Sequence, residues 1–257
     1  MSPIRSGHTR ALVQRTLTTS VLAVLLASCN TTEPSATLSI SADFEGASLD
    51  SWTLIGGDTV EISIRPDTNF PVGFWFAFQV HGGSGRELVS RVDDANSLYG
   101  PGTWGTKQPV ASSDGGESWT RITETALPGG VFTFRHRPGS NLERIALAIP
   151  YPLSRWLNYK ASIETAPFVD RVEVIGQSLD GNPIHMIEVT DAAEPDAGKS
   201  LIWAVGRQHP GEPEASFMME GFIDWVLGSS AGATELRKRA RVVLVPFLNP
   251  DGVVRGN

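Results

Sequence analysis

A histidine and a glutamate stand three residues apart in the stretch VGRQHPGEPEASFMMEGFIDWVLG, residues 205–228. Zinc takes imidazole nitrogen and carboxylate oxygen as ligands, and a catalytic zinc site keeps a fourth place for water. The pair follows an apolar run, 201–205, and precedes an amphipathic helix pattern. Because ligands gather at the carboxyl ends of strands in open α/β sheets, both position and chemistry suit His209 and Glu212 as metal ligands.

A purely structural role explains the same residues. Glu212 and Glu214 are acids in the first turn of the expected helix, where they complement the helix dipole. Pro213 stands near the first helical position, where its missing N–H is harmless. Since the H-x-x-E pattern specifies only two positions, the pattern alone favours this role, with His209 as an ordinary loop residue.

The wider sequence supports the metal site. GRQHPGEPEAS is preceded by IGQSLDGNPIHMIEVT and followed by VPFLNPDGVVRGN. These stretches resemble the zinc metallocarboxypeptidases, in the branch that includes the cytosolic carboxypeptidases, closely over 151–257 and in architecture only over 36–150. The resemblance implies that His209 and Glu212 are the first two zinc ligands. It also implies that the turn formed by residues 249–252, Asn-Pro-Asp-Gly, shapes the substrate site.

Two domains must position these residues, and the first is a β domain over residues 38–150. Short β-prone runs such as TVEISIRP and VFTFRHRP alternate apolar with polar residues and are separated by Gly, Pro, Asn and Asp. This pattern predicts an antiparallel β-sandwich. The resemblance agrees, because this branch has a β-sandwich before its catalytic domain.

The second domain, residues 151–257, has a mixed pattern that makes the chain α+β overall. We expect a helix over 151–165, a hairpin, a strand, a helix from about 213 to 227, a short helix near 234–239 and a final strand. This order predicts a mixed sheet with helices on its faces, the first part of an α/β metallocarboxypeptidase domain. The runs LIWAV and VVLVPFL are expected to be central strands covered on both sides.

The activity implied by the resemblance is zinc-dependent hydrolysis of the C-terminal peptide bond of a peptide or protein. The family's third zinc ligand, glutamate base and carboxylate-binding residues would lie beyond Asn257, so we expect no catalytic residue here and a two-ligand site that holds zinc weakly. His8, His81 and His136 are poorly placed to replace them, and His185 is expected to be exposed or partly hydrogen-bonded. We therefore expect an inactive fragment with an exposed apolar sheet edge.

The first 28 residues differ from the rest. Three arginines and no acidic residue precede the apolar run VLAVLLAS, which is shorter than the roughly 20 residues that span a bilayer. We expect a lipoprotein signal peptide over 1–28, lipidation of Cys29 within the lipobox-like LASC, and a tether over 29–37. An ordinary signal peptide cut nearby is the alternative. Lipidation predicts an anchor in the bacterial cell envelope, and Asn30 is compatible with the outer membrane.

The charge composition of the chain limits the classes of partner that it can bind. The chain has 21 basic and 28 acidic residues, and loss of the leader removes three arginines and no acid. Because nucleic-acid binding relies on clustered basic residues, we expect no nucleic acid as partner. The basic cluster at 237–241 stands at an expected helix end, where cations complement the dipole. Cys29 is the only cysteine, so a disulfide within the chain is excluded.

Two other functions compete with the enzyme. A non-enzymatic surface lipoprotein would bind glycan or protein through Trp75, Trp104 or Trp119 of its β domain. A sialidase-like glycosidase would rest on SSDGGESW, residues 112–119, which matches an Asp-box. The motif occurs once, whereas propellers repeat it in several blades. We expect instead a hairpin whose turn, 114–116, supplies positive φ angles and returns Trp119 to the core.

Overall fold

The computed structural model describes residues 37–68, 70–93, 95–98 and 102–257. The expected signal peptide, the lipidation of Cys29 and nearly all of the expected tether lie outside these residues. Within the described part of the chain, no helix is long and apolar enough to cross a membrane.

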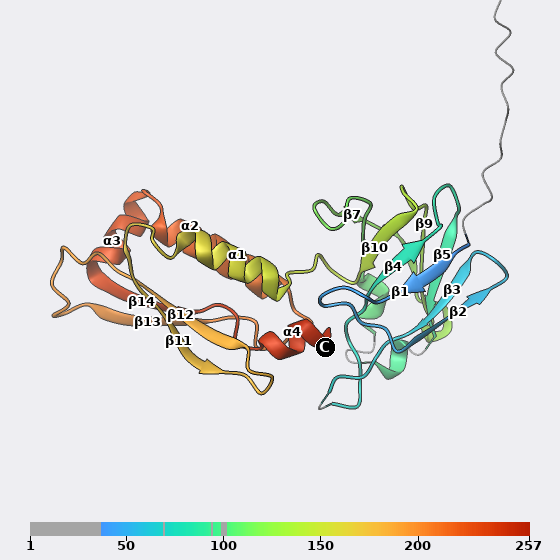
Figure 1. The fold of residues 1–257 in the computed structure, drawn as a ribbon, viewed down its shortest axis with the longest axis horizontal. Coiled ribbons are helices and arrows are strands. Elements are labelled where there is room, and N and C mark those ends of the chain that lie inside the picture. The colour runs from blue at the N-terminus through green and yellow to red at the C-terminus, as the bar shows by residue number, and fades with distance from the viewer. Residues whose placement is uncertain (1–36, 69, 94, 99–101) are drawn as a thin grey trace, which may run out of the picture. The chain divides into compact units, whose positions relative to one another are not determined.

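The β domain is a sandwich of two five-stranded sheets (Figure 1). In spatial order, the first sheet holds β1 (Ser39–Ser41), β4 (Ala77–His81), β10 (Leu142–Ala146), β6 (Val110–Ser112) and β7 (Thr120–Arg121), and the second holds β2 (Ser51–Ile55), β3 (Thr59–Ser63), β5 (Leu88–Val92), β9 (Phe132–His136) and β8 (Glu124–Ala126). The predicted sandwich is confirmed. The pairing is antiparallel throughout except that β3 and β5 run parallel.

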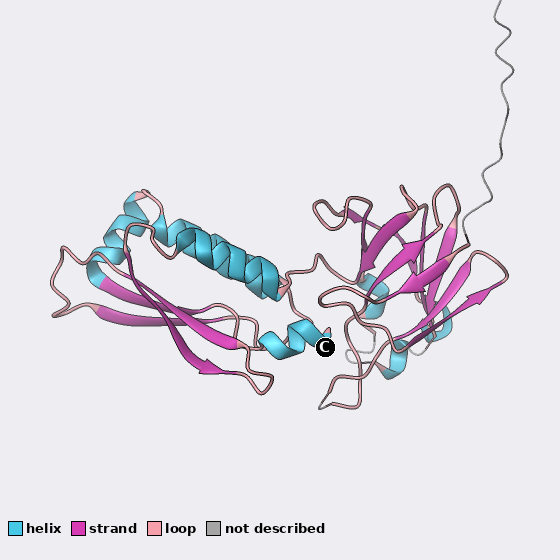
Figure 2. Ribbon diagram, in the orientation of Figure 1, coloured by secondary structure: helices cyan, strands magenta, loops and turns pink. Residues whose placement is uncertain are grey.

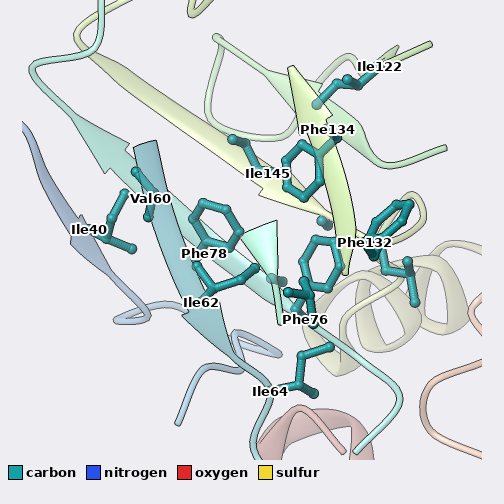
Figure 3. Close-up of a cluster of buried hydrophobic side chains, with 14 of the residues drawn as sticks. Ile40, Val60, Ile62, Ile64, Phe76, Phe78, Ile122, Phe132, Phe134 and Ile145 are labelled. Atoms are coloured by element: carbon teal, nitrogen blue, oxygen red, sulfur yellow. The ribbon is translucent and has the colours of Figure 1, made fainter. Parts of the chain in front are cut away.

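Alternating strands build the core between these sheets. In β3, Val60 and Ile62 are buried while the residues between them are only partly covered. Aromatic side chains from both sheets meet in the same core, and the rings of Phe76 and Phe134 stack with centroids 5.8 Å apart (Figure 3). The helical pieces described within this domain are single 3-10 turns: η1 (Ala95–Ser97), η2 (Trp104–Thr106) and η3 (Pro128–Gly130).

The tryptophans considered for glycan binding belong to this core. Trp75 and Trp104 are 5% and 0% exposed. Trp119 packs against the core, and its indole N–H donates to the Gly116 carbonyl at 3.0 Å. Trp75 and Trp104 therefore have no open face on which a sugar ring could stack.

The Asp-box sequence forms the expected hairpin turn. Gly115 and Gly116 adopt φ angles of 80° and 104°. The Asp114 carboxylate accepts hydrogen bonds from the Ser118 hydroxyl and amide and from the Ser112 hydroxyl. The Ser118 hydroxyl is the main cause that holds the pKa of Asp114 well below its usual range. The Asp114 carboxylate is thus used within the turn, while the Ser113 hydroxyl donates to Glu143 and the Gly115 carbonyl accepts from Arg144.

The α/β domain contains one four-stranded mixed sheet and four helices (Figures 1 and 2). The sheet order is β11 (Val169–Gln177), β12 (Pro183–Val189), β14 (Ala240–Val245) and β13 (Ser200–Val205), with only β13 and β14 parallel; the helices are α1 (Leu153–Ile163), α2 (Glu214–Leu227), α3 (Ala231–Arg239) and α4 (Pro250–Arg255). This agrees with the expected α/β character.

Helices cover one face of this sheet, not both as expected. In α2, Met219, Ile223 and Val226 are buried at helical spacing, and they share a core with Ile187 of β12 and Leu244 of β14. Figure 1 shows α1 and α2 over this face. On the opposite face, the described buried residues form only a small cluster: Met186, Val243 and Val245.

Two local expectations need correction. Residues 249–252 were expected to form a turn, but they start α4. The Asn249 side chain accepts from the Gly252 amide at 3.0 Å, and Pro250 occupies the first turn, where proline is tolerated. Likewise, α3 begins three residues earlier than expected, because the Ser230 side chain accepts from the Ala233 amide and fixes its start.

The apolar run LIWAV forms an edge strand, contrary to the expected central position. Within the described residues β13 pairs only with β14, whereas β14 is central and largely buried. Leu201, Trp203 and Val205 are 58%, 56% and 40% exposed. The exposed apolar edge that the resemblance implied is therefore present, and such an edge is a template for intermolecular pairing.

Replacing Leu201 and Trp203 together by lysine should raise the concentration at which the chain stays monodisperse, because charge on an edge strand blocks strand addition. Light scattering against concentration would measure the effect. Met218→Lys, on the 58% exposed Met218 of α2, is the control for charge and lost apolar surface. Equal improvement in the control would contradict a special role of the edge.

Candidate metal centre

The centre is built on the ends of the two parallel strands. The Gly206 amide donates to the Val245 carbonyl at 2.9 Å, one residue past the end of β13. A Cβ on Gly206 would lie 2.7 Å from the Met219 side chain and 3.1 Å from the Pro246 carbonyl. Only glycine lets the chain leave the sheet so close to α2. The following residue, Arg207, has a φ angle of 54° and turns the chain outward.

The loop that follows brings the two candidate ligands together. His209 Nδ1 and Glu212 Oε2 lie 3.1 Å apart. The Glu212 amide donates to the His209 carbonyl at 3.2 Å, which closes the loop as a turn. Their side chains are 77% and 57% exposed, so both remain open to a ligand. Among the described residues, the Glu212 carboxylate pairs with this imidazole, and no helix amide donates to it.

Residues 249–252 support this loop from the neighbouring strand. The Asn249 amide donates to the Arg207 carbonyl at 3.1 Å, and its side-chain amide donates to the Gln208 carbonyl at 3.2 Å. A Cβ on Gly252 would lie 2.7 Å from the Pro210 ring, so α4 packs directly against the loop. The shaping role expected for this segment is consistent with these contacts.

Asp251 fastens the same helix to the β11–β12 hairpin. Its carboxylate accepts hydrogen bonds from the Ser178 hydroxyl, the Asp180 amide at 2.9 Å and the Asn182 side chain at 2.8 Å. Burial acts to raise the pKa of Asp251, but these hydrogen bonds, led by that from Asn182, lower the pKa below its ordinary value. The ionised carboxylate is therefore the form that the fold stabilises.

The described structure places the other histidines elsewhere. His81 contacts Ser41 within the sandwich at 3.0 Å, and His136 is buried there, where burial lowers its pKa to about 4. His185 is 8% exposed beside Trp156. It is thus buried, whereas an exposed or partly hydrogen-bonded position was expected, and its Nδ1 has no hydrogen-bond partner among the described residues.

A hollow of about 380 Å³ opens beside the pair. His209 and Glu212 line it together with Arg65, Phe70 and Phe74 of the β domain. Space for a ligand therefore adjoins both donor atoms.

Comparison with known proteins explains this architecture. The family model described as the cytosolic carboxypeptidase N-terminal domain matches residues 40–148, and the model described as zinc carboxypeptidase matches residues 156–257. This chain belongs to the zinc carboxypeptidase family. Its N-terminal sandwich further relates it to the cytosolic carboxypeptidases within that family.

Individual family members agree over most of this chain. An uncharacterised protein of Zymomonas mobilis is 31% identical over 222 residues, covering 86% of this chain and 56% of that protein. Mouse cytosolic carboxypeptidase 6 is 28% identical over 246 residues, covering 86% of this chain and 44% of that protein. A metallo-carboxypeptidase structure from Burkholderia cenocepacia superposes with a TM-score of 0.79 at 27% identity, covering 86% of this chain and 59% of that one. The chain thus spans about half the length of the carboxypeptidase relatives it matches.

The chemical types and the separation of the two candidate donors fit a zinc ion. Zinc bonds of about 2.0–2.2 Å to imidazole nitrogen and carboxylate oxygen place two donors roughly 3–3.5 Å apart, and His209 Nδ1 and Glu212 Oε2 meet this requirement. No group of three metal-ligating side chains occurs among the described residues. The described chain therefore offers two donors.

Sequence reasoning missed one residue of this centre. Arg207 is 3% exposed and donates to the Pro210 carbonyl between the two candidate ligands. The available signal was its place, directly after a strand and a glycine, where a charged side chain turns back toward the interior. That signal does not identify the partners: Pro210 and Ser216 follow within nine residues, but Tyr151 lies 56 residues earlier in the chain.

Two substitutions of Asn249 distinguish the effects of its two side-chain hydrogen bonds. Asn249→Ala removes the cap of α4 and the bond to the Gln208 carbonyl, and should destabilise the fold by about 1–2 kcal/mol. Asn249→Asp keeps a capping oxygen but cannot donate to Gln208, so it should recover most of the stability yet leave the loop looser. Chemical denaturation measures the first effect, and amide exchange of residues 207–212 measures the second. Full loop protection in Asn249→Asp would refute the assigned bond.

The lowered pKa of Asp251 predicts that the free energy of unfolding depends on pH. Because its folded pKa lies below the ordinary value of 3.8, its stabilisation is complete above pH 3.8 and disappears as the pH falls through the lower folded value. Asp251→Asn should cost about 1–3 kcal/mol at neutral pH and lose less stability than the unchanged chain as the pH falls below 4. Unfolding curves from pH 7 to 2 test this. Parallel pH profiles would show that Asp251 does not contribute.

Proposed function

We propose that the whole protein is a zinc-dependent carboxypeptidase that hydrolyses the C-terminal peptide bond of a peptide or protein. The observation that carries the proposal is the 3.1 Å approach of His209 and Glu212 at a strand end, inside the segment matched by the zinc carboxypeptidase model. Because the chain spans about half the length of its relatives, the activity is proposed for the whole protein.

In this proposal His209 and Glu212 hold the zinc ion. Bound zinc supplies a Lewis acid that polarises the scissile carbonyl and lowers the pKa of water. His209 must keep a ring nitrogen unprotonated to act as a ligand, and Glu212 must be ionised. Their exposure leaves both able to bind, and the loop that carries them accepts hydrogen bonds from Arg207 and Asn249.

The substrate would approach through the hollow beside the pair. Phe70 and Phe74 offer apolar surface there, and Arg65 adds a cation. The alternative, glycan binding by the β domain, gains no support from Trp75 and Trp104, since both are buried. The lipid anchor at Cys29, and with it a place in the cell envelope, remains a prediction from the sequence.

Peptide hydrolysis tests the proposal on the whole protein. Peptides with a free C-terminus should lose their last residue, which mass spectrometry detects, while the same peptides with an amidated C-terminus should not. A chelator should abolish release and added Zn²⁺ should restore it.

His209→Ala and Glu212→Ala should each reduce kcat/KM by more than about 100-fold, because loss of a residue that merely supports a ligand already costs about 10–100-fold. His81→Ala, in the sandwich, is the control and should retain activity. Metal-independent release, or equal loss in the control, would reject the proposed site.

A further inference from the structure

Arg207 is a buried cation directly behind the candidate ligands. Its side chain makes four hydrogen bonds, all to neutral acceptors. Nε and Nη2 donate to the Pro210 carbonyl at 3.0 and 2.8 Å, and Nη1 donates to the Tyr151 carbonyl at 3.2 Å and the Ser216 hydroxyl at 2.9 Å. The guanidinium also lies over the Phe247 ring at 5.4 Å. Among the described residues no carboxylate forms an ion pair with it.

Keeping this charge inside the protein is costly. The Arg207 side chain is 3% exposed, and a buried guanidinium needs hydrogen bonds to compensate for the water that it loses. Arg207 also has a positive φ angle, which a residue with a Cβ adopts at a cost. The arrangement combines two unfavourable features, which points to a purpose beyond packing.

The partners of Arg207 define that purpose. Pro210 lies between His209 and Glu212, and Ser216 lies in the first turn of α2, directly after them. One planar guanidinium therefore joins the metal loop to the helix that follows it and to Tyr151, at the start of the α/β domain. Lysine cannot reproduce this, because its single ammonium group lacks the rigid fork of donors.

We propose that Arg207 is the positioning residue of the metal centre: by fixing the Pro210 carbonyl, it holds His209 and Glu212 at ligand separation. It acts through the loop and touches neither ligand. The identity of the ion rests on the proposed function, whereas the positioning of the loop does not depend on it.

The chain contains a matched control. Arg237 of α3 is also 3% exposed, and its Nη1 donates to two backbone carbonyls, those of Val226 and Gly228. Its guanidinium lies over the Phe168 ring at 3.9 Å. Arg237 is thus a second buried guanidinium held by backbone carbonyls, with its Nε unpartnered among the described residues, and the hydrogen bonds described for it lie outside the metal loop.

The test compares Arg207→Lys with Arg237→Lys in the 257-residue chain. In metal-free protein, hydrogen exchange of amides 208–216 should become about tenfold faster or more in Arg207→Lys and stay unchanged in Arg237→Lys, since an opened loop loses its protection. Zn²⁺ affinity, measured by competition with a chromogenic chelator, should fall about 10–100-fold in Arg207→Lys alone. Equal effects of both variants, or an unchanged loop in Arg207→Lys, would overturn the proposal.

A second variant protects the test against misfolding. Ser216→Ala keeps the cation and removes one of its acceptors, so exchange of amides 208–216 should rise by a smaller factor while the chain stays folded. Unchanged exchange in Ser216→Ala would also count against the proposal. If the whole protein releases no C-terminal residue from peptides while Arg207→Lys still frees the loop, the proposed function fails and the positioning role stands.

Discussion

The candidate centre depends on one constraint, the parallel pairing of β13 with β14 and its continuation past both strand ends. The Gly206 amide bonds to the Val245 carbonyl, the Leu248 amide returns to the Gly206 carbonyl, and the Asn249 amide bonds to the Arg207 carbonyl. These bonds bring two segments that are distant in sequence into register. The loop with the two candidate ligands and the helix that packs against it therefore start from the same sheet edge, as parallel strands require.

Around these paired strand ends, the candidate ligands are exposed, whereas the residues that support their loop are buried. His209 and Glu212 are largely exposed, whereas Arg207 and Asp251 are 3% and 7% exposed. Asp251 connects α4 to the β11–β12 hairpin, and α4 in turn packs against Pro210 through Gly252. A rigid, fully hydrogen-bonded support beneath open ligands is the arrangement that preorganises a binding site.

The sequence predicted the local features and missed those that depend on distant partners. The spacing of His209 and Glu212 placed them correctly after a strand and before a helix, and the glycines after Asp114 correctly predicted a hairpin turn. The burial of Arg207 was not predictable, because Tyr151 and Ser216 reach it only in the folded chain. The apolar run of β13 suggested a central strand. An apolar composition indicates that a strand tends to be buried, but it does not identify the element that covers the strand.

The spacing of the two donors explains why the support matters for affinity. Two ligands three residues apart share one short loop, so bringing them together costs little chain entropy compared with joining distant segments. Their separation is instead set by the conformation of that loop, in which Arg207 donates to the Pro210 carbonyl and Asn249 donates to the Gln208 carbonyl. Any loosening of these contacts spreads the donors over many separations, only some of which suit one ion. Under the proposed function, metal affinity is therefore coupled to the hydrogen bonds that Arg207 and Asn249 donate to the loop, even when both candidate ligands are intact.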